Sequence, residues 1–349
     1  GSGNYSDLDS AELTLTLAPV LERGGKLDAR RALAQSRIDA AALQREAARL
    51  DLLAEVARRY LAVVAAQRQR DLADADIAQR QRTVAAAQQR LTAGASPESV
   101  VLTAQAALAR AQLERTRSEH AAASARQHLA ALWGEREPQF AVAASDPMSL
   151  PPIEDFGALA ALLETTPELL RFADERRIGE ARLRLARAQS RADLEWQVGA
   201  RAFNENSDVA LVAGVSMALG SARRAQPEIR AAEAELEVAG IEREVQGLAL
   251  YSTLAEAHGR YRVAQLEVER LRVDVLPRLT RAETAAERAY RAGAISYLEW
   301  AQAQPERTSV PRQQLDTALD AQRSLIEIQR LTGQALVAPV APTEQDATP

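Results

Sequence analysis

Two very long helical stretches constrain this chain more than any other feature. Residues Leu27 to Thr92 run for 66 residues without proline, and the stretch from Pro227 to Ala292 has the same length. At a rise of 1.5 Å per residue, each stretch would form a helix roughly 100 Å long. Helices of this length do not fit within a compact globular domain, so the sequence predicts that long helices pack side by side.

The two stretches belong to an internal repeat. An offset of 199 residues aligns Gly94 with Gly293, and it also aligns the "LWG" ending at Gly134 with the "LTG" ending at Gly333. An apolar, strand-like segment precedes each long stretch, at Glu12 to Leu21 in the first copy. Each copy therefore has the order strand, long helix, turn and shorter helix.

The repeat divides the chain into four regions. The return helices are expected at about Pro97 to Trp133 and Tyr297 to Thr332, and a short helix near Phe156 to Leu163 is followed by one that begins at Pro167 and ends near Ala192. The predicted regions are a first repeat (1–134), a Pro-rich bridge with helices (135–192), a second repeat (193–334) and a flexible C-terminal tail (335–349).

The composition fits coiled-coil packing. Hydrophobic residues make up 47% of the chain but aromatic residues only 4%, so alanine fills many of the seam positions. Ile77, Val84 and Leu91 follow a strict seven-residue repeat. Because alanine buries little area, one isolated helical hairpin would be weakly held. Further copies of the chain are expected to pack around it.

Several functional classes are excluded. The formal net charge of −5 is spread over interleaved acidic and basic residues, which argues against nucleic-acid binding. There is no cysteine, and neither a catalytic motif nor a phosphate-binding loop is present, so we expect no enzyme, no cofactor and no metal site. His120 and His128 lie about two helical turns apart, which favours a solvated helix face over a metal site.

The two turns share their chemistry. Gly94 and Gly293 can take the left-handed conformation that ends a helix. Ser96 and Ser296 can cap the helices that follow, and Glu299 would complete a capping box. A turn without further function is one interpretation, whereas a pair of such turns at the end of long helices favours a docking surface.

A strand hairpin precedes the second long helix. Residues Asp193 to Asn204 alternate apolar and polar side chains, and Asp208 to Gly220 follows after the "ENS" loop. This pattern fits strands of a membrane β-barrel and fits equally a soluble hairpin that covers the helices. In the membrane interpretation, Trp196 and Phe203 would lie near the two lipid interfaces. No apolar run approaches the roughly 20 residues of a transmembrane helix.

These motifs together resemble the outer-membrane factor (TolC-like) family over nearly the whole chain. The resemblance is carried by "LERGGKLDARRALAQ", "RRYLAVVAAQRQRDLADADI", "RLTAGAS", "LARAQSRADLEWQVGARA" and "RAYRAGAISYLEW". The "GGK" beginning at Gly24, with its following "AR", most resembles the branch that serves heavy-metal resistance-nodulation-division efflux pumps.

The resemblance implies a mainly α fold with a small β part. Long antiparallel helices would form a coiled-coil barrel in the periplasm, and the strands would belong to a trimeric outer-membrane β-barrel. The homotrimer would be a passive exit duct of a tripartite efflux pump, with divalent heavy-metal cations as the candidate substrate. A periplasmic adaptor would bind its tips and connect it to an inner-membrane transporter. The alternative is a non-channel coiled-coil scaffold or adaptor.

The family's docking pattern can be placed on the two turns. The first turn matches it at Arg90, Leu91 and Ser96. The second matches at Gly293 and Ser296, but Ala289 and Tyr290 stand in the places of Arg90 and Leu91, and Arg291 is the substitute that we expect.

Other features lead to separate expectations. Pro277 predicts a bend that would act as a hinge, and Pro305 and Pro311 favour a kink in the second return helix. Glu299 and Glu306 are candidates for lining a pore. Compared with the family, a first strand and two helices are expected to be missing, which would give a trimer nine strands instead of twelve. Such a fragment is not expected to seal a pore.

Overall fold

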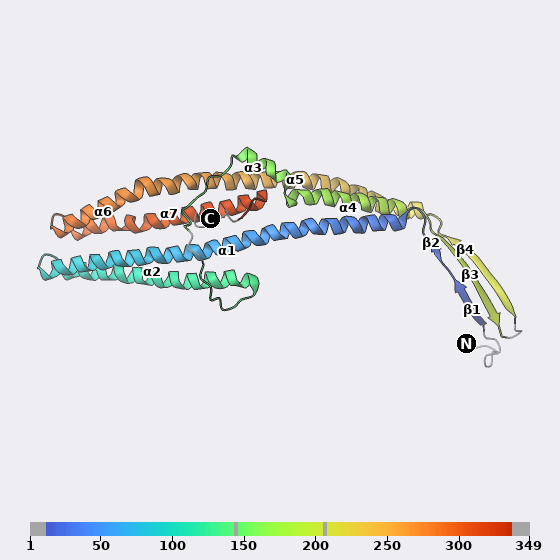
Figure 1. Cartoon of the computed structure of the whole chain (residues 1–349), viewed down its shortest axis with the longest axis horizontal. Coiled ribbons are helices and arrows are strands. Elements are labelled where there is room, and N and C mark those ends of the chain that lie inside the picture. The colour runs from blue at the N-terminus through green and yellow to red at the C-terminus, as the bar shows by residue number, and fades with distance from the viewer. Residues whose placement is uncertain (1–11, 143–145, 205–207, 337–349) are drawn as a thin grey trace, which may run out of the picture. The chain divides into compact units, whose positions relative to one another are not determined.

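The computed structural model describes residues 12–142, 146–204 and 208–336, so most of the predicted tail and the "ENS" loop lie outside the described residues. The chain is mainly helical with one small antiparallel sheet, as the sequence predicts (Figure 1). The helices are α1 (Lys26–Thr92), α2 (Glu98–Ala130), α3 (Phe156–Leu162), α4 (Pro167–Gln189), α5 (Ser221–Arg270), α6 (Leu276–Arg291) and α7 (Tyr297–Thr332). The strands are β1 (Glu12–Leu17), β2 (Val20–Leu21), β3 (Leu194–Phe203) and β4 (Val209–Met217).

Contacts group the chain into two compact units. The first unit combines Gly1–Ala47 with Pro167–Leu248, and the second combines Ala48–Thr166 with Ala249–Pro349. Each unit takes residues from both predicted repeats. These contact units therefore do not test the predicted division into a first repeat, a bridge, a second repeat and a tail. That division stays a prediction.

The long helices match the sequence closely, with one correction at a helix start. Helix α1 begins one residue before the predicted Leu27 and ends at Thr92 as expected. Helix α5, however, begins at Ser221 and contains Pro227, so the prediction that Pro227 is its first residue was wrong. The helix starts directly after Gly220, which has a positive φ of 75° and accepts a hydrogen bond from the Arg224 amide at 3.1 Å.

The second long helix contains one π-helical turn, Leu271–Val275, directly before α6. Pro277 lies in the first turn of α6 and has no N–H for the carbonyl four residues earlier. A π turn accommodates such a missing donor by widening the hydrogen-bond pattern locally. Helix α7, in contrast, continues without interruption through Pro305 and Pro311. The hinge at Pro277 stays a prediction.

The first unit contains the sheet, in which β3 is central. Strand β4 pairs with one side of β3, and β1 and β2 pair with the other, all antiparallel. The single strand predicted from Glu12 to Leu21 was wrong, because the pairing stops at Ala18 and Pro19. Pro19 has no amide hydrogen to donate, although its carbonyl accepts a hydrogen bond from the Trp196 amide at 3.4 Å.

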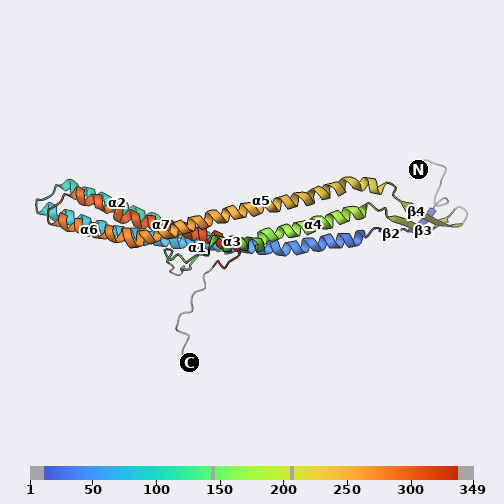
Figure 2. The same cartoon turned by 90° about the horizontal axis from the view of Figure 1, so that it is seen from above.

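Helix α4 lies alongside the parts of α1 and α5 that belong to the same unit (Figures 1 and 2). Arg187 of α4 forms an ion pair with Glu233 of α5 at 2.9 Å, and Arg182 pairs with Glu235. Gly179 leaves room for Leu236, whose Cδ1 would lie 3.1 Å from an added Cβ. Exposed ion pairs and the small residue Gly179 therefore lie at the contacts between these helices.

The second unit is built from two helical hairpins, α1 with α2 and α6 with α7 (Figure 1). The hairpins pack on each other through alanine and leucine, as the composition predicts. One cluster joins α1 to α7 through the buried residues Ala54, Leu61, Ala65, Leu315, Leu319 and Ile326. Leucine and isoleucine side chains thus pack against the small alanines of the facing helix.

The Pro-rich bridge crosses this unit as a strap held by side chains. Tyr261 and Gln265 of α5 donate hydrogen bonds to the carbonyl of Pro151. Gln322 of α7 donates to the carbonyls of Pro147 and Ser149 at 3.3 and 3.2 Å. Burial of the Tyr261 phenol raises its pKa to about 12, so it stays a hydrogen-bond donor at neutral pH.

Candidate functional site: the hairpin tips and the exposed sheet

The two tips have the same backbone geometry. Gly94 and Gly293 have φ values of 68° and 78°, which confirms the left-handed turns. In the first tip the Ala95 amide donates to the carbonyl of Arg90 at 2.8 Å, and in the second the Ala294 amide donates to Ala289 at 2.9 Å. These bonds satisfy carbonyls that the helix ends would otherwise leave unpaired.

The helices that leave the tips begin differently. At the second tip, the Glu299 amide donates to Ser296 Oγ at 3.3 Å and the Ser296 amide donates to Glu299 Oε2 at 2.7 Å, which confirms the capping box. The hydrogen bonds from the Ser296 backbone and hydroxyl lower the pKa of Glu299. At the first tip, Pro97 occupies the N-cap position and no side chain caps α2, so the cap predicted from Ser96 was wrong.

Arg90 connects the two tips. Its Nη1 donates to the carbonyl of Tyr290 at 2.6 Å, and its Nη2 donates to the carbonyl of Ala95 at 3.3 Å. The guanidinium carbon also lies 4.8 Å from the centre of the Tyr290 ring, within the range of a cation–π contact. The side chain that the resemblance assigned to docking is thus engaged within the chain.

An aromatic cluster lies under this arginine. Tyr290 and Trp300 are 1% and 0% exposed, and their rings stack at 4.7 Å with an interplanar angle of 26°. Tyr297 contacts both rings edge-on, at 6.1 and 6.4 Å. Leu91 and Tyr297 also pack on buried residues of the first hairpin. Sequence reasoning missed this cluster, although three aromatic residues lie within eleven positions of a chain that has few.

Polar side chains continue the contact between α1 and the second hairpin. The amide of buried Gln304 donates to the hydroxyl of Thr83 at 3.1 Å and accepts from Arg80 at 3.0 Å. Gln79 donates to the buried carboxylate of Glu283. Each of these buried groups has a partner, which keeps the cost of burying them low.

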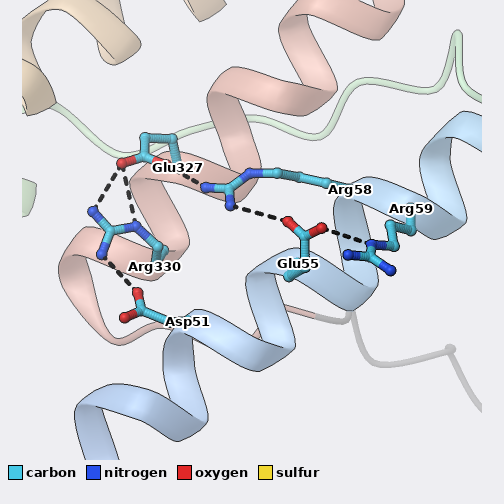
Figure 3. A network of polar contacts seen from close by, with 6 residues as sticks. All are labelled: Asp51, Glu55, Arg58, Arg59, Glu327 and Arg330. Atoms are coloured by element: carbon cyan, nitrogen blue, oxygen red, sulfur yellow. Dashed lines mark hydrogen bonds and ion pairs between the residues drawn. The ribbon is translucent and has the colours of Figure 1, made fainter. Parts of the chain in front are cut away.

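A second polar network joins the same helices further from the tips (Figure 3). Glu327 of α7 accepts from Arg58 at 2.7 Å and from Arg330 at 2.9 Å. Arg330 also pairs with Asp51 at 3.1 Å. On α1, Glu55 accepts from Arg59 at 2.6 Å, and this hydrogen bond is the largest cause of its lowered pKa.

The other predicted tip residues lie on the surface or close to it. Arg291, Gly94, Gly293 and Ser296 are exposed, and Ser96 is half-buried. Arg291 forms an ion pair with Glu287 one turn earlier, at 2.7 Å. Glu299 and Glu306 are also exposed. Adaptor docking at the tips and pore lining by the two glutamates stay predictions.

The sheet exposes one continuous apolar face. Strand register and the pleat place alternate residues of β1, β3 and β4 on the same side. Leu211 on β4 is 87% exposed, and the other large apolar side chains of this face are between 41% and 79% exposed. The apolar sheet face consists of Leu13, Leu15, Leu17, Trp196, Val198, Ala200, Ala202, Val209, Leu211, Ala213, Val215 and Met217.

The opposite face is polar. Arg201 donates to the hydroxyl of Thr14 at 2.9 Å and lies 3.5 Å from Glu12. Phe203 pairs in register with Glu12, so alternation places it on this polar face, whereas Trp196 is on the apolar one. The two aromatic residues therefore lie on opposite faces of the sheet, and the interface role of Phe203 stays a prediction. An interface role for Trp196 stays a prediction.

Within the described ranges, no three or more histidine, aspartate or glutamate side chains lie close enough together to hold a metal ion. His120 and His128 both lie on exposed positions of α2. Among the helices of the described residues, none combines the length and the apolar character that a bilayer crossing requires.

Comparisons with known proteins relate this geometry to one family. A family model described as outer membrane efflux protein matches residues 1–135. The cobalt-zinc-cadmium resistance protein CzcC of Cupriavidus metallidurans is 29% identical over 286 residues, which cover 81% of this chain and 68% of CzcC.

Two solved structures are similar in fold. The outer-membrane channel OprN aligns with a TM-score of 0.76 and 20% identity, over 94% of this chain and 83% of OprN. CusC, whose structures describe transmembrane channel formation, aligns with a TM-score of 0.76 and 17% identity, over 94% of this chain and 85% of CusC.

Proposed function

The chain belongs to the outer membrane efflux protein family, and on that premise we propose that three copies form the outer-membrane exit duct of a tripartite efflux pump. A member of this family is a channel that extends into the periplasm and not an enzyme. The duct is passive, since its partners supply the transport energy.

The apolar sheet face is the observation that carries this proposal. A side chain as exposed as Leu211 in water costs free energy, whereas the same side chain against acyl chains does not. The polar face, with Arg201 and Thr14, would line the aqueous interior. A soluble scaffold has no reason to expose twelve apolar positions on one side of a sheet.

The substrate class that we propose is divalent heavy-metal cations. Support comes from the similarity to a cobalt-zinc-cadmium resistance protein over 81% of the chain. The adaptor would bind the exposed tip surface around Gly94, Gly293, Arg291 and Ser296, where Arg90 joins two turns that both have a left-handed glycine. An inner-membrane transporter would deliver the cations through that adaptor.

Two measurements test the duct. The mass of the full-length protein in detergent should be that of a trimer, and planar bilayers that contain the full-length protein should show discrete, uniform conductance steps. A monomer without conductance would support the scaffold alternative. For the substrate, cells without the gene should lose tolerance to cobalt, zinc and cadmium and regain it on complementation. Loss of tolerance to organic compounds alone would contradict the metal assignment.

A further inference from the structure

Four arginine residues gather where the sheet meets the helices of the first unit. Arg23 follows β2 by two residues, and Arg191 precedes β3 by three. Arg223 and Arg224 lie in the first turn of α5, which comes directly after β4. The register pairs the last residue of β2 with the first of β3, and that residue with the last of β4. All four arginines therefore lie near the same end of the strands, where the sheet meets the helices.

The side chains of this arginine cluster have no ion-pair or hydrogen-bond partner among the described residues, unlike the neighbouring cations. Lys26 forms an ion pair with Asp193 at 2.7 Å, and Arg30 pairs with Glu22. Arg191 and Arg224 line a cavity of about 520 Å³ that Lys26 and Ser221 also line. Two of the four unpaired guanidinium groups therefore border one cavity, where they are available to an anion.

Three carboxylates line the same cavity. Asp193 is neutralised, because Lys26 and the Arg23 amide both donate to it and lower its pKa. Strand alternation places Glu195 on the polar face of the sheet, and Glu228 lies on the second turn of α5. Within the cavity, Arg191 and Arg224 thus stand against Glu195 and Glu228, and the excess positive charge of the region comes from Arg23 and Arg223, which do not line the cavity.

Exposed apolar side chains border the cluster directly. Leu21 and Met217 are the last residues of β2 and β4, at this end of the sheet, and Leu219, between β4 and α5, is 78% exposed. Exposed apolar side chains and unpaired arginine side chains therefore lie within a few residues of each other. A glycerophospholipid has the same order, from acyl chain to phosphate. Arginine is also well suited to phosphate, since its planar group can donate two parallel hydrogen bonds.

We propose that the arginine cluster binds the phosphate of an anionic phospholipid headgroup in the leaflet next to the helices. The proposal rests on the proposed insertion of the apolar sheet face into the outer membrane. The first turn of α5 supports it, since it contains no acidic side chain and its residues Ser221 and Arg224 line the same cavity.

The test is native mass spectrometry of the detergent-solubilised protein with added phosphatidylglycerol or phosphatidylcholine. The wild type should retain phosphatidylglycerol preferentially. The Arg191→Gln/Arg224→Gln variant should lose about fivefold in this preference for each arginine removed. Arg262→Gln/Arg281→Gln is the matched control, because both arginines are exposed, have no ion pair among the described residues and belong to the second unit.

The outcomes separate this proposal from the proposed function. Equal preference in the cluster variant and the wild type, or equal loss in the control, would overturn the headgroup site. Competition by inorganic phosphate alone would replace the lipid with free phosphate as the ligand. Vesicle flotation decides the premise: a wild-type chain that does not float with vesicles overturns both proposals. Flotation without a phosphatidylglycerol preference overturns only the headgroup site.

Discussion

The guanidinium of Arg90 donates to the carbonyl of Tyr290 at 2.6 Å and lies over the ring of the same residue. One side chain of the first tip thus binds both the backbone and the aromatic face of the second. Arg90 also binds its own turn at Ala95. The register of the two tips relative to each other therefore depends on this arginine.

Replacing Arg90 should loosen the tips. We expect Arg90→Ala to reduce the free energy of unfolding by about 2 kcal/mol, since a charge-assisted hydrogen bond and a cation–π contact are lost. Amide hydrogen exchange at 290–297 should accelerate. The control is Arg291→Ala, whose single ion pair within α6 is worth only about 0.3–0.5 kcal/mol. Equal exchange in both variants would show that Arg90 does not join the tips.

This contact also changes how docking is tested. An Arg90→Glu variant would disturb the pairing of the tips as well as any adaptor contact, so its loss of binding would be ambiguous. Arg291→Glu changes a side chain that is exposed at the tip. We expect it to weaken adaptor binding while unfolding stays within about 0.5 kcal/mol of the wild type. Unchanged binding in a pull-down with the adaptor would exclude Arg291 from the docking surface.

The aromatic cluster should be the most sensitive part of the tips. Trp300→Ala removes a fully buried ring that stacks on Tyr290, and we expect a loss of about 3–5 kcal/mol. Trp133→Ala is the matched control, because Trp133 is 54% exposed and should cost about 1 kcal/mol or less. Urea unfolding followed by circular dichroism measures both. Similar losses would contradict the assignment of Trp300 to the core.

A comparison of Gly94 with Gly259 measures the effect of backbone strain without steric overlap. An added Cβ at Gly94 or at Gly259 would have no heavy atom within 4 Å, but only Gly94 has a positive φ. We expect Gly94→Ala to destabilise by about 1 kcal/mol and Gly259→Ala, inside α5, to stabilise by about 0.5–1 kcal/mol. Changes of the same sign in thermal unfolding would refute the left-handed turn.

The network around Glu327 should make stability depend on pH. Burial opposes ionisation of Glu327, but its bonds with Arg330 and Arg58 outweigh burial and lower its pKa below 4.5; the pKa of Glu55 is lowered by Arg59. The stabilisation is therefore present above about pH 4.5 and is lost as the pH falls through the lowered values. Glu327→Gln should lose about 1 kcal/mol at pH 7 and much less at pH 3. Glu306→Gln, at an exposed carboxylate, is the control and should change the free energy of unfolding by about 0.5 kcal/mol or less at pH 7.

The membrane assignment predicts a face-dependent response. Leu211→Lys would place a charge against lipid and should cost on the order of 2–4 kcal/mol of membrane stability. Ser216→Lys lies on the other face, opposite Glu195, and should be tolerated. Folding into vesicles, followed by the heat-dependent shift of the trimer on gels, measures both. Equal tolerance of the two lysines would argue against a lipid-facing Leu211.

The sequence predicts the local features of this fold well and its contacts between segments poorly. Helix ends near Thr92 and Thr332 follow from glycine and serine chemistry within a few residues, so periodicity and capping suffice. The bond from Arg90 to Tyr290 joins residues 200 positions apart, and no local pattern encodes it. The start of α5 was misplaced because proline is over-represented at the first position of helices, whereas Pro227 lies on the second turn of this one.

Selection should act differently on the residues of the Pro-rich bridge and on the side chains that donate hydrogen bonds to its carbonyls. Its carbonyls are held by side chains of α5 and α7, among them Tyr261, Gln265 and Gln322. A carbonyl is present whatever residue carries it. During divergence, the bridge is therefore free to exchange its side chains but not to change its length, whereas the three donors are under selection. Related sequences should vary at Pro147, Ser149 and Pro151 while conserving the donors opposite them.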